Sequence, residues 1–447
     1  MEDRNIIAIE IGSSKIKGAL GTFSSSGILT VHAVEEESHE DWVRYGAVSN
    51  VEEVAALVAK IIRKIENRIS PRKVAAVYLA LGGRSFCSEP KEIEHRFPEE
   101  TEITEEIIAR LIAEAEATPR FDHEILKVIP RRFVVDKTAV GRPKGTVGRS
   151  IRMSANLISC RQQLRRNLDR IFGEKLSLPV AGYFVRQLAI ADTVLSADER
   201  ALGCMLVDFG AETTTVSIYR DGTLQYMATI PLGSRNITRD IQQLNFLPEQ
   251  AENIKRTVGN AFGQTPVIPG EIDYSEVNKH VSYRVGEIIA NIRKQLDYAE
   301  MKPEMLPAGI VIVGGGSRLT DFNDRLAKTS RMKVKVGAVN LPEIRWSDSR
   351  ISPTDACDVI STLYAAARSG AQECLTVPEI VETPVEQPVF EPSQPEPEEV
   401  VEETVEIAEE ELPKKEKKKG PSWFDKLHKI VVSIVQENED DELQDDE

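Results

Sequence analysis

The sequence predicts an α/β protein in which one strand-and-helix plan occurs twice. In the first half, three β-like runs within residues 6–36 are joined by Gly and Ser turns, and a helical pattern then leads to a strand candidate at 74–83. The same order restarts after Leu202, where three further β-like runs precede a helix that begins near Thr238. Because strands and helices alternate in both halves, we expect two α/β lobes of the same plan.

The two copies align at one constant offset of 198 residues, which places Glu10 on Asp208 and Gly12 on Gly210. Each copy reads apolar, acid, apolar, Gly, two small or polar residues and a return strand. Glycine-bearing turns can direct backbone N–H groups at an anion, and the two acids suit a hydrated Mg²⁺. The pattern therefore indicates two hairpins facing a Mg²⁺-bound polyphosphate, although an acid and a glycine also occur in hairpins for local reasons.

A third glycine-bearing element follows at residues 307–320, which read PAGIVIVGGGSRLT. Its β-branched strand ends in three glycines directly before a helical pattern, and such a turn lets a ligand lie against bare backbone. The stretch matches neither the Rossmann fingerprint nor the P-loop pattern, which argues against a dehydrogenase and a P-loop NTPase. Together with the two hairpins, it indicates a nucleotide site of another type.

The net charge of −16 belongs to the C-terminal part of the chain. Residues 375–413 carry 13 acids and no base, residues 414–436 carry 7 bases and 2 acids, and residues 437–447 carry 8 acids. The body before residue 375 is left with 49 bases and 49 acids. Because this body is neutral, it offers no basic surface, and we expect no nucleic-acid partner.

Cysteine usage and the N-terminus indicate a cytoplasmic protein. The five cysteines are scattered without a CxxC pair, which fits reduced thiols better than a disulfide framework or a zinc site. The opening MEDRN leads straight into a strand-like run, without the apolar stretch of a secretion signal. Since no apolar run approaches the roughly 18 residues that a spanning helix needs, we expect any membrane contact to be peripheral.

The tail predicts a linker followed by an amphipathic helix. Seven prolines and uniform negative charge in residues 375–413 predict an extended, disordered linker. In the basic segment 414–436, seven apolar residues share one helical face behind a run of lysines, which fits an interfacial helix on an anionic membrane. These residues are Trp423, Phe424, Leu427, Ile430, Val431, Ile434 and Val435. The same face also suits a helix that binds a partner or docks on the chain itself.

These features resemble the actin, Hsp70 and sugar-kinase superfamily, and within it the FtsA family of bacterial actin-like cell division proteins. The closer resemblance covers about residues 5–370. It is carried by IEIGSSKIKG, RYGAVSN, HEILKVIPRRFVVD, VGRSIRMSANLISC, VDFGAETTTVSIYRDGTLQYMATIPLGSRNITRDI, AENIK and GIVIVGGGSRL, in the family's order. The resemblance implies duplicated actin-like (ribonuclease H-like) lobes with ATP between them, a small α+β inserted domain and a disordered C-terminal tail.

The resemblance also divides the chain into parts. It implies a first actin-like lobe at 1–82 and 161–200, an inserted subdomain used in polymerisation at 83–160, a second-lobe core at 201–240 and 301–370, an outer subdomain at 241–300, a linker at 375–413, a membrane-targeting helix at 414–436 and an acidic end at 437–447. Within the insert, we expect a helix over 104–117 and a strand pair over LKVIPRRFVVD.

By resemblance, the nucleotide contacts three groups of residues. The phosphates would lie at Gly12, Ser13, Ser14, Lys15, Gly210, Ala211, Glu212 and Thr213. The nucleoside would lie at Glu252, Lys255, Gly314, Gly315, Gly316 and Ser317. Glu10 and Asp208 would hold Mg²⁺ through water, because that ion gives up its hydration shell reluctantly. Glu252 and Lys255 also fit an ordinary solvated helix pair.

The chain departs from the family pattern at the site. The family usually has Asp where this chain has Glu10, and glycines where it has Ala211 and Glu212. Glu212 can still donate its backbone N–H while its side chain turns toward Mg²⁺ or a base across the cleft. We expect at most weak ATPase activity and assign no catalytic residue. Gln187 is the nearest candidate for a general base by order along the chain, and it fits a solvent-facing helix residue equally well.

The resemblance implies a function at the division site. It implies an ATP-binding protein that polymerises on the cytoplasmic face of the cell membrane, anchors the FtsZ ring and meets other division proteins. The FtsZ C-terminal peptide would dock near residues 242–300, where Arg284, Arg293 and Lys294 lie on a helix that also reads as a solvated face. The alternatives are a shape-determining or pilus-assembly actin relative and a sugar-kinase-like phosphotransferase; the phosphotransferase would not explain the tail.

Overall fold

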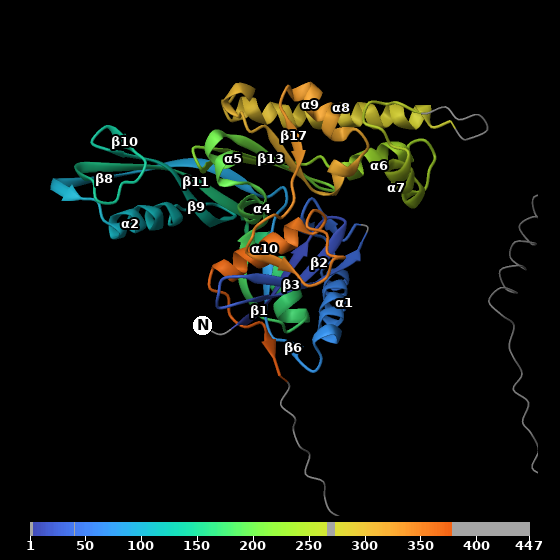
Figure 1. The fold of residues 1–447 in the computed structure, drawn as a ribbon, viewed down its shortest axis with the longest axis horizontal. Coiled ribbons are helices and arrows are strands. Elements are labelled where there is room, and N and C mark those ends of the chain that lie inside the picture. The colour runs from blue at the N-terminus through green and yellow to red at the C-terminus, as the bar shows by residue number, and fades with distance from the viewer. Residues whose placement is uncertain (1–2, 40, 266–272, 378–447) are drawn as a thin grey trace, which may run out of the picture. The chain divides into compact units, whose positions relative to one another are not determined.

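Two β-sheets of matching strand order organise the protein (Figure 1). The computed structural model describes residues 3–39, 41–265 and 273–377. The first sheet has the order β12-β7-β1-β2-β3-β18 and the second has the order β15-β14-β13-β16-β17. In both sheets, an antiparallel three-stranded meander is extended by parallel strands beside its first strand. The predicted α/β fold with a duplicated plan is confirmed.

The two hairpins also have the predicted register. The last strand pair before the first turn is Ile11 with Ile16. The last pair before the second turn is Phe209 with Thr214, at the same offset of 198 along the chain. The equivalence that the sequence predicts for the two turns therefore holds residue by residue in the strands that carry them.

The first lobe is a sheet between helices. Its strands are β1 (Arg4–Ile11), β2 (Lys15–Phe23), β3 (Leu29–Ser38), β7 (Val77–Leu81), β12 (Val180–Val185) and β18 (Ile344–Trp346). Helix α1 (Val51–Ile69) packs on β2 and β3, and α10 (Cys357–Arg368) packs on β1, β2, β7 and α4 (Arg186–Val194). Helix α1 begins after Asn50, whose side chain accepts the Glu53 N–H at 3.2 Å, as the capping pattern predicts.

The second lobe places its sheet beside a group of helices. The strands are β13 (Cys204–Phe209), β14 (Thr214–Arg220), β15 (Thr223–Ile230), β16 (Ile310–Val313) and β17 (Val334–Val336). The helices are α5 (Ala197–Leu202), α6 (Ser234–Gln242), α7 (Pro248–Thr257), α8 (Ser275–Tyr298) and α9 (Phe322–Ser330). Helix α6 begins before Thr238, the start expected from the sequence, because Gly233 closes the preceding turn and its N–H bonds the Asn236 side chain at 2.9 Å.

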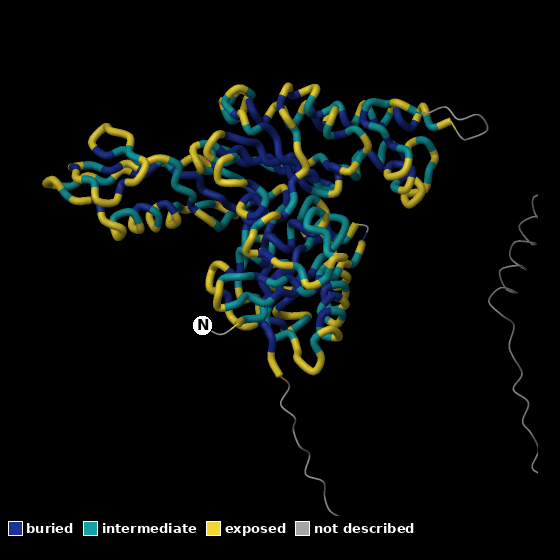
Figure 2. The backbone as a smooth tube through the Cα atoms, viewed as in Figure 1, coloured by how far each residue is buried: buried dark blue, intermediate teal, exposed yellow. Residues whose placement is uncertain are grey.

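Strand β13 is buried on both faces, and this fixes where its acid points. Met205 and Val207 belong to the apolar core beneath the second-lobe helices. Cys204 and Leu206 belong instead to the core that continues into the first lobe. Because successive side chains in a strand alternate faces, Asp208 points the same way as Leu206, toward the first lobe. Figure 2 shows buried residues concentrated along the strands of both sheets.

The insert forms a third sheet with its own core. Its order is β10-β9-β11-β8, with one helix packed on it. Its elements are β8 (Cys87–Glu102), α2 (Glu105–Glu116), β9 (His123–Val135), β10 (Thr138–Val140) and β11 (Val147–Arg161). The strand pair expected over LKVIPRRFVVD is wrong, since β9 runs through it as one strand. An irregularity in the β9–β11 pairing between Ser154 and Ala155 accommodates Pro130 without a turn.

Two sequence assignments of the C-terminal region are corrected by the topology. Residues 344–368, expected in the second lobe, return to the first: β18 pairs with β3, and the apolar face of α10 is buried in the first-lobe core. Leu375 and Thr376, assigned to the linker, form β19 (Leu375–Thr376), which pairs with β6 (Lys73–Val74). In both cases long-range strand pairing decides the placement, and local composition carries no sign of it.

The remaining short elements lie within the lobes. They are β4 (Val43–Arg44), β5 (Ala47–Val48), α3 (Gln162–Asp169), the π-helix η1 (Arg170–Lys175) and the 3-10 turns η2 (Pro303–Met305) and η3 (Gly315–Arg318). The predicted linker from residue 378, the amphipathic helix with Trp423 to Val435 and the acidic end lie outside the described residues.

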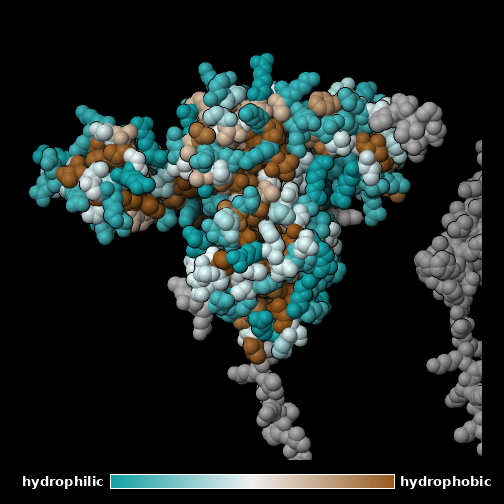
Figure 3. Space-filling view, in the orientation of Figure 1, coloured by the Kyte–Doolittle hydropathy of each residue, from teal (hydrophilic) through white to brown (hydrophobic). Residues whose placement is uncertain are grey.

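The outer surface of the first lobe along α1 is hydrophilic (Figure 3). Lys60 and Lys64 of this helix pair with Glu37 of β3 at 2.7 and 2.6 Å. Within the described part of the chain, we find no helix of the length and apolar character that crossing a membrane requires.

Candidate functional site

Two tight hairpin turns of the same construction form the candidate site. The Gly12 N–H donates to Lys15 O at 3.0 Å, and the Gly210 N–H donates to Thr213 O at 2.9 Å. A Cβ on Gly12 would lie 2.9 Å from Lys15 O, and one on Gly210 would lie 3.0 Å from Thr213 O. Both positions therefore need glycine, because any side chain would crowd the turn that it closes.

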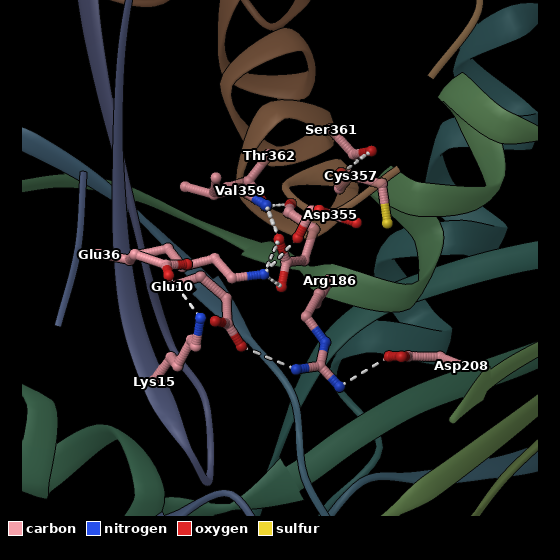
Figure 4. Close-up of polar contacts among 12 residues, drawn as sticks. Glu10, Lys15, Glu36, Arg186, Asp208, Asp355, Cys357, Val359, Ser361 and Thr362 are labelled. Atoms are coloured by element: carbon pink, nitrogen blue, oxygen red, sulfur yellow. Dashed lines mark hydrogen bonds and ion pairs between the residues drawn. The ribbon is translucent and has the colours of Figure 1, made fainter. Parts of the chain in front are cut away.

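One arginine joins the acids of the two hairpins (Figure 4). Arg186 Nη1 donates to Glu10 Oε1 at 2.8 Å, and its Nη2 donates to Asp208 Oδ2 at 2.8 Å. Arg186 is the first residue of α4 and directly follows β12, so it stands at the edge where the parallel strands β1, β7 and β12 end. The two acids predicted to share a cation thus share this guanidinium.

A second, partly buried ion pair supports the first-lobe side of the site. Lys17 Nζ donates to Asp358 Oδ1 at 3.0 Å and Oδ2 at 2.7 Å, and to the backbone oxygen of Asp355 at 2.7 Å. Lys17 pairs with Glu10 across β1 and β2, whereas Asp358 lies in the first turn of α10. These contacts tie the returning C-terminal helix to the hairpin that carries Glu10.

Burial dominates the electrostatics of this group. Burial, reinforced by Asp358, raises the pKa of Glu10 from 4.5 to about 7 against the opposing effects of Arg186 and Lys17. Burial also opposes the charge on Arg186, but Asp208 and Glu10 raise the pKa of Arg186 above its ordinary value. The arginine therefore stays charged while the acidity of Glu10 is weakened.

Glycines beside the guanidinium leave room for it. A Cβ on Gly82 would lie 3.2 Å from Arg186 Cζ, so the arginine rests directly on the backbone after β7. On the second lobe, Gly314 has φ +90°, and a Cβ there would lie 2.9 Å from Asp208 Oδ1 and 2.5 Å from Phe209 O. The side chains of the bridge are thus held between two bare segments of backbone.

Glu212 makes a second link between the lobes. Its carboxylate is fully buried: Oε2 accepts the Tyr45 N–H at 2.6 Å, and Oε1 accepts from Arg239 at 2.7 Å. Arg44 and Arg235 lie 3.9 and 3.6 Å from the same oxygen. The side chain thus turns away from its own hairpin toward arginines, one of which, Arg44, belongs to the first lobe, so it presents no bare charge to a phosphate.

The side chains of the first turn are engaged locally. Ser13 Oγ accepts the Gly46 N–H at 3.0 Å, and His39 Nε2 lies 2.8 Å from Gly12 O. Lys15 pairs with Glu36 of the adjacent strand, as Figure 4 shows. A phosphate at this turn would therefore be met by backbone N–H groups first, and by the Lys15 ammonium only if it left Glu36.

Glu252 and Lys255 form part of a buried network rather than a solvated helix pair. Lys255 is 8% exposed and donates to Glu252 Oε2 at 2.6 Å and Thr238 Oγ1 at 2.9 Å. The Thr238 hydroxyl donates to the same Glu252 oxygen at 2.6 Å. Burial lowers the pKa of Lys255, although Glu252 opposes this. The network fixes α7 on α6, directly behind the second turn.

The three predicted nucleoside glycines have different surroundings. A Cβ on Gly316 would lie 2.6 Å from a Phe209 ring carbon, whereas one on Gly315 would meet no atom within 4 Å. Ser317 is buried, and its Oγ donates to Gly314 O at 2.8 Å. Of these residues, Gly315 is the one with open space above its backbone.

Gln187 is buried, so the solvent-facing alternative is wrong. It is 5% exposed, and neither its amide nitrogen nor its oxygen has a hydrogen-bond partner within the described part of the chain. It lines a cavity of about 10 Å³ together with Arg186 and Thr215, which has room for about one water. Because a neutral amide cannot take up a proton at ordinary pH, Gln187 can orient a water but cannot act as a general base.

The predicted partner residues on α8 are partly engaged. Arg284 makes a bidentate contact with Asp240 at 2.6 and 2.9 Å. Lys294 Nζ lies 2.9 Å from Asp297 Oδ2. Arg293 is exposed on the same helix. Arg284 thus holds α8 against α6, and an acidic partner would have to compete with Asp240 for it.

A hollow of about 320 Å³ beside β3 includes none of the turn residues. Its charged side chains are paired within the chain: Glu36 with Lys15, Arg68 with Glu35, Asp348 with Arg350 and Asp355 with Arg318. It therefore offers no unpaired charge to anchor a ligand, and the two turns remain the stronger candidate.

The donors at the turns fit a phosphate chain better than a metal ion between the acids. Mg²⁺ prefers carboxylate and water oxygens, and Glu10 and Asp208 supply carboxylates. Arg186 already lies between them. Among residues 3–39, 41–265 and 273–377, no group of three or more His, Cys, Asp or Glu is placed to hold a metal ion.

The sequence interpretation missed the cationic half of the site: Lys17, Arg44, Arg186, Arg235 and Arg239. One signal was available for Arg186, which directly precedes Gln187 at the junction of a strand and an otherwise apolar helix start, VRQLAIA. An arginine at such a junction faces a strand-end edge where ligands bind.

The fold and the paired turns define an actin-like protein. A solved structure of the PilM-PilN type IV pilus biogenesis complex has the same fold, with a TM-score of 0.57 and 17% identity over 81% of this chain and 98% of that chain. The family model "Cell division protein FtsA" matches residues 205–366, and "SHS2 domain inserted in FTSA" matches residues 83–159.

Curated relatives agree with these matches. The cell division protein FtsA of Porphyromonas gingivalis is 29% identical over 371 residues, which cover 79% of this chain and 74% of the relative. FtsA of Escherichia coli K12 is 25% identical over 355 residues, which cover 74% of this chain and 84% of the relative. The chain belongs to the FtsA family of cell division proteins.

The two adjacent glycines of η3 provide a matched pair for testing the packing at this turn. We expect Gly316→Ala to lower the free energy of unfolding by about 1–3 kcal/mol, since the added Cβ overlaps the Phe209 ring. Gly315→Ala should change it by less than about 0.5 kcal/mol. Denaturant unfolding of both variants measures the difference, and equal stabilities would contradict the packing described for Phe209.

His39 should make the first turn sensitive to acid. Burial lowers its pKa from the ordinary 6.5, so the unfolded chain binds this proton more readily than the folded one. Neutral His39 therefore makes its full contribution to the free energy of unfolding above pH 6.5. This contribution is lost as the pH falls below that value. In denaturant unfolding at about pH 8 and about pH 5, His39→Gln should show a smaller acid loss than the unsubstituted protein. An equal loss in both would mean that His39 does not contribute.

Proposed function

We propose that this FtsA-family protein binds ATP between its two lobes, polymerises on the cytoplasmic face of the cell membrane at the division site and anchors the FtsZ ring. The observation that carries the nucleotide part is the pair of equivalent turns, Gly12–Lys15 and Gly210–Thr213, whose acids converge on one guanidinium. Backbone N–H groups at such turns are suited to phosphate oxygens.

The nucleoside would lie against the second lobe. Gly315 offers open backbone there, and Glu252 with Lys255 stands directly behind the second turn. The two elements are neighbours, since the Ala261 N–H, beyond the end of α7, donates to Thr320 O at 2.9 Å. Bound ATP would thus touch both lobes and favour their closed arrangement by mass action.

Hydrolysis is the weaker part of the expected activity. Gln187 is the side chain best placed to orient a water in the cavity beside Arg186, but it cannot accept the proton that attack on a phosphate releases. We therefore propose binding with at most weak ATPase activity. The sugar-kinase alternative would require a carboxylate free to deprotonate a hydroxyl, whereas Glu10 and Asp208 are both paired with Arg186.

The inserted subdomain would supply polymer contacts from a fixed position. Asn156 Nδ2 donates to Leu224 O at 2.8 Å, and Arg131 Nη1 donates to Gln225 O at 3.3 Å. These bonds, together with the contacts of β8 and β9 with β15, hold the insert on the second lobe. Because filament contacts need a defined geometry between subunits, an insert held in this way suits that role.

FtsZ would dock on the outer subdomain. Helix α8 presents the exposed side chain of Arg293, together with Lys294, whose ammonium lies 5.7 Å from the centre of the Tyr298 ring. An acidic peptide could pair with these cations, and exposed Tyr283 adds apolar surface on the same helix. Surface pairs of this kind contribute about 0–1 kcal/mol each, so single-copy docking would be weak.

Membrane attachment would rest on the helix at 414–436. Its seven apolar side chains would each contribute less than the roughly 1.5–3 kcal/mol of full burial, and its lysines about 1 kcal/mol each near anionic lipid. A single helix would therefore bind weakly, and a polymer would bind more tightly through many copies.

The match to the SHS2 domain inserted in FtsA supports this division role over a shape-determining or pilus-assembly role.

Liposome co-sedimentation tests the anchor. We expect the full chain to pellet with anionic vesicles, more so with ATP, and a chain ending at Gly420 to stay in the supernatant. Ile430→Glu on the apolar face should abolish pelleting, whereas Ser433→Glu on the polar face should weaken it only slightly, because just the first substitution puts a charge into the interface. Equal pelleting of the full and shortened chains would refute the anchor, and sugar-dependent ADP release would favour the kinase alternative.

A further inference from the structure

The guanidinium of Arg186 has the place that a bridging cation would need. It comes from the first lobe, at the start of α4, and reaches acids at the ends of β1 and β13. Each carboxylate accepts one of its N–H groups at 2.8 Å. Through these two contacts the guanidinium joins an acid of each lobe, as Figure 4 shows.

The surroundings hold the guanidinium in this position. The side chain of Arg186 is 16% exposed, and those of Glu10 and Asp208 are 3% and 8% exposed. Gly82 lies directly against its Cζ, where any larger residue would push the guanidinium out. Charge-assisted bonds of a planar guanidinium to two carboxylates also fix its orientation. The guanidinium is thus held between two buried carboxylates.

A divalent cation and this guanidinium exclude each other. A hydrated Mg²⁺ shared by Glu10 and Asp208 would have to occupy the space between the two carboxylates. Arg186 fills that space, and its positive charge repels a second cation in a site from which water is largely excluded. Mg²⁺ could therefore enter only if Arg186 gave up both acids.

We propose that Arg186 takes the place of the metal in this chain: it bridges Glu10 and Asp208 permanently, so that the site binds a nucleoside di- or triphosphate without a Mg²⁺ shared by these acids. The guanidinium has five N–H donors, and the two acids accept one each. The others are available to phosphate oxygens, which arginine binds well. Arg186 is then a positioning residue that replaces a cofactor.

The first test uses a metal alone and needs no nucleotide. Mn²⁺ binding to the full chain is measured by electron paramagnetic resonance. The number of bound ions that disappears on Asp208→Asn is the number held by Glu10 and Asp208. This comparison removes the Mn²⁺ that the acidic tail binds. The unsubstituted protein and its Asp208→Asn variant should bind equally. The Arg186→Gln variant should bind one Mn²⁺ more than the unsubstituted protein. The double variant Arg186→Gln with Asp208→Asn should not bind this additional ion.

Arg186→Gln leaves two buried acids unpaired and could unfold the chain, so Arg186→Lys is the second variant. An ammonium can pair with one acid at a time, which opens the other to the metal while charge is retained. Both variants should melt at a higher temperature when Mn²⁺ or Mg²⁺ is added, because metal binding stabilises the folded state. In the unsubstituted protein, added metal should raise the melting temperature no more than it does in the Asp208→Asn variant.

The second test compares nucleotide affinity with Mg²⁺ and with EDTA, and it rests on the proposed function. ADP and ATP should bind the unsubstituted protein equally in both conditions, whereas Arg186→Lys should lose roughly tenfold or more in EDTA. The proposal would be overturned if the unsubstituted protein lost nucleotide affinity tenfold in EDTA. It would also be overturned if the unsubstituted protein bound an Mn²⁺ that its Asp208→Asn variant does not bind. If no variant binds nucleotide, the ATP function fails, and the Mn²⁺ measurement still decides the role of Arg186.

Discussion

The arrangement of the site depends on one buried interaction, the bridge of Arg186 to Glu10 and Asp208. Each acid is the penultimate residue of the first strand of a meander, and the two meanders belong to different sheets. Removing one partner of a buried ion pair typically costs about 3–5 kcal/mol, because the charge left behind is unpaired and poorly hydrated. The bridge therefore fixes how far apart the two turns stand, and with them the space for a phosphate chain.

The departures from the family pattern are connected through this bridge and through Glu212. At Glu10 the longer acid meets an arginine, and at Glu212 a carboxylate in place of a glycine reaches the Tyr45 N–H and Arg239. Both carboxylates are thereby paired with arginines of the chain itself. The Arg186–Asp208 and Glu212–Tyr45 contacts both cross between the lobes, so the lobes of this chain are joined by their own polar groups.

Local signals in the sequence were sufficient for the repeated hairpins. The offset that relates Glu10 to Asp208 also relates the last strand pairs of the turns, since strand alternation and turn glycines are set by neighbours along the chain. The return of residues 344–368 to the first lobe was not predictable in this way, nor was the pairing of Arg186 with an acid 176 positions earlier in the sequence. Such contacts depend on how whole elements pack. For Gln187 and Lys255, burial by other elements likewise replaced the solvent exposure that their helices alone allowed.

In the proposed nucleotide complex, the guanidinium of Arg186, and not a metal ion, joins Glu10 and Asp208. A crystal structure of the full chain grown with Mg²⁺ and a non-hydrolysable ATP analogue would test this arrangement. We expect the phosphates at the two turns, with Nη1 and Nη2 of Arg186 still bound to Glu10 and Asp208 and no metal between these carboxylates. A Mg²⁺ held by both acids directly or through water, with Arg186 turned away, would contradict it.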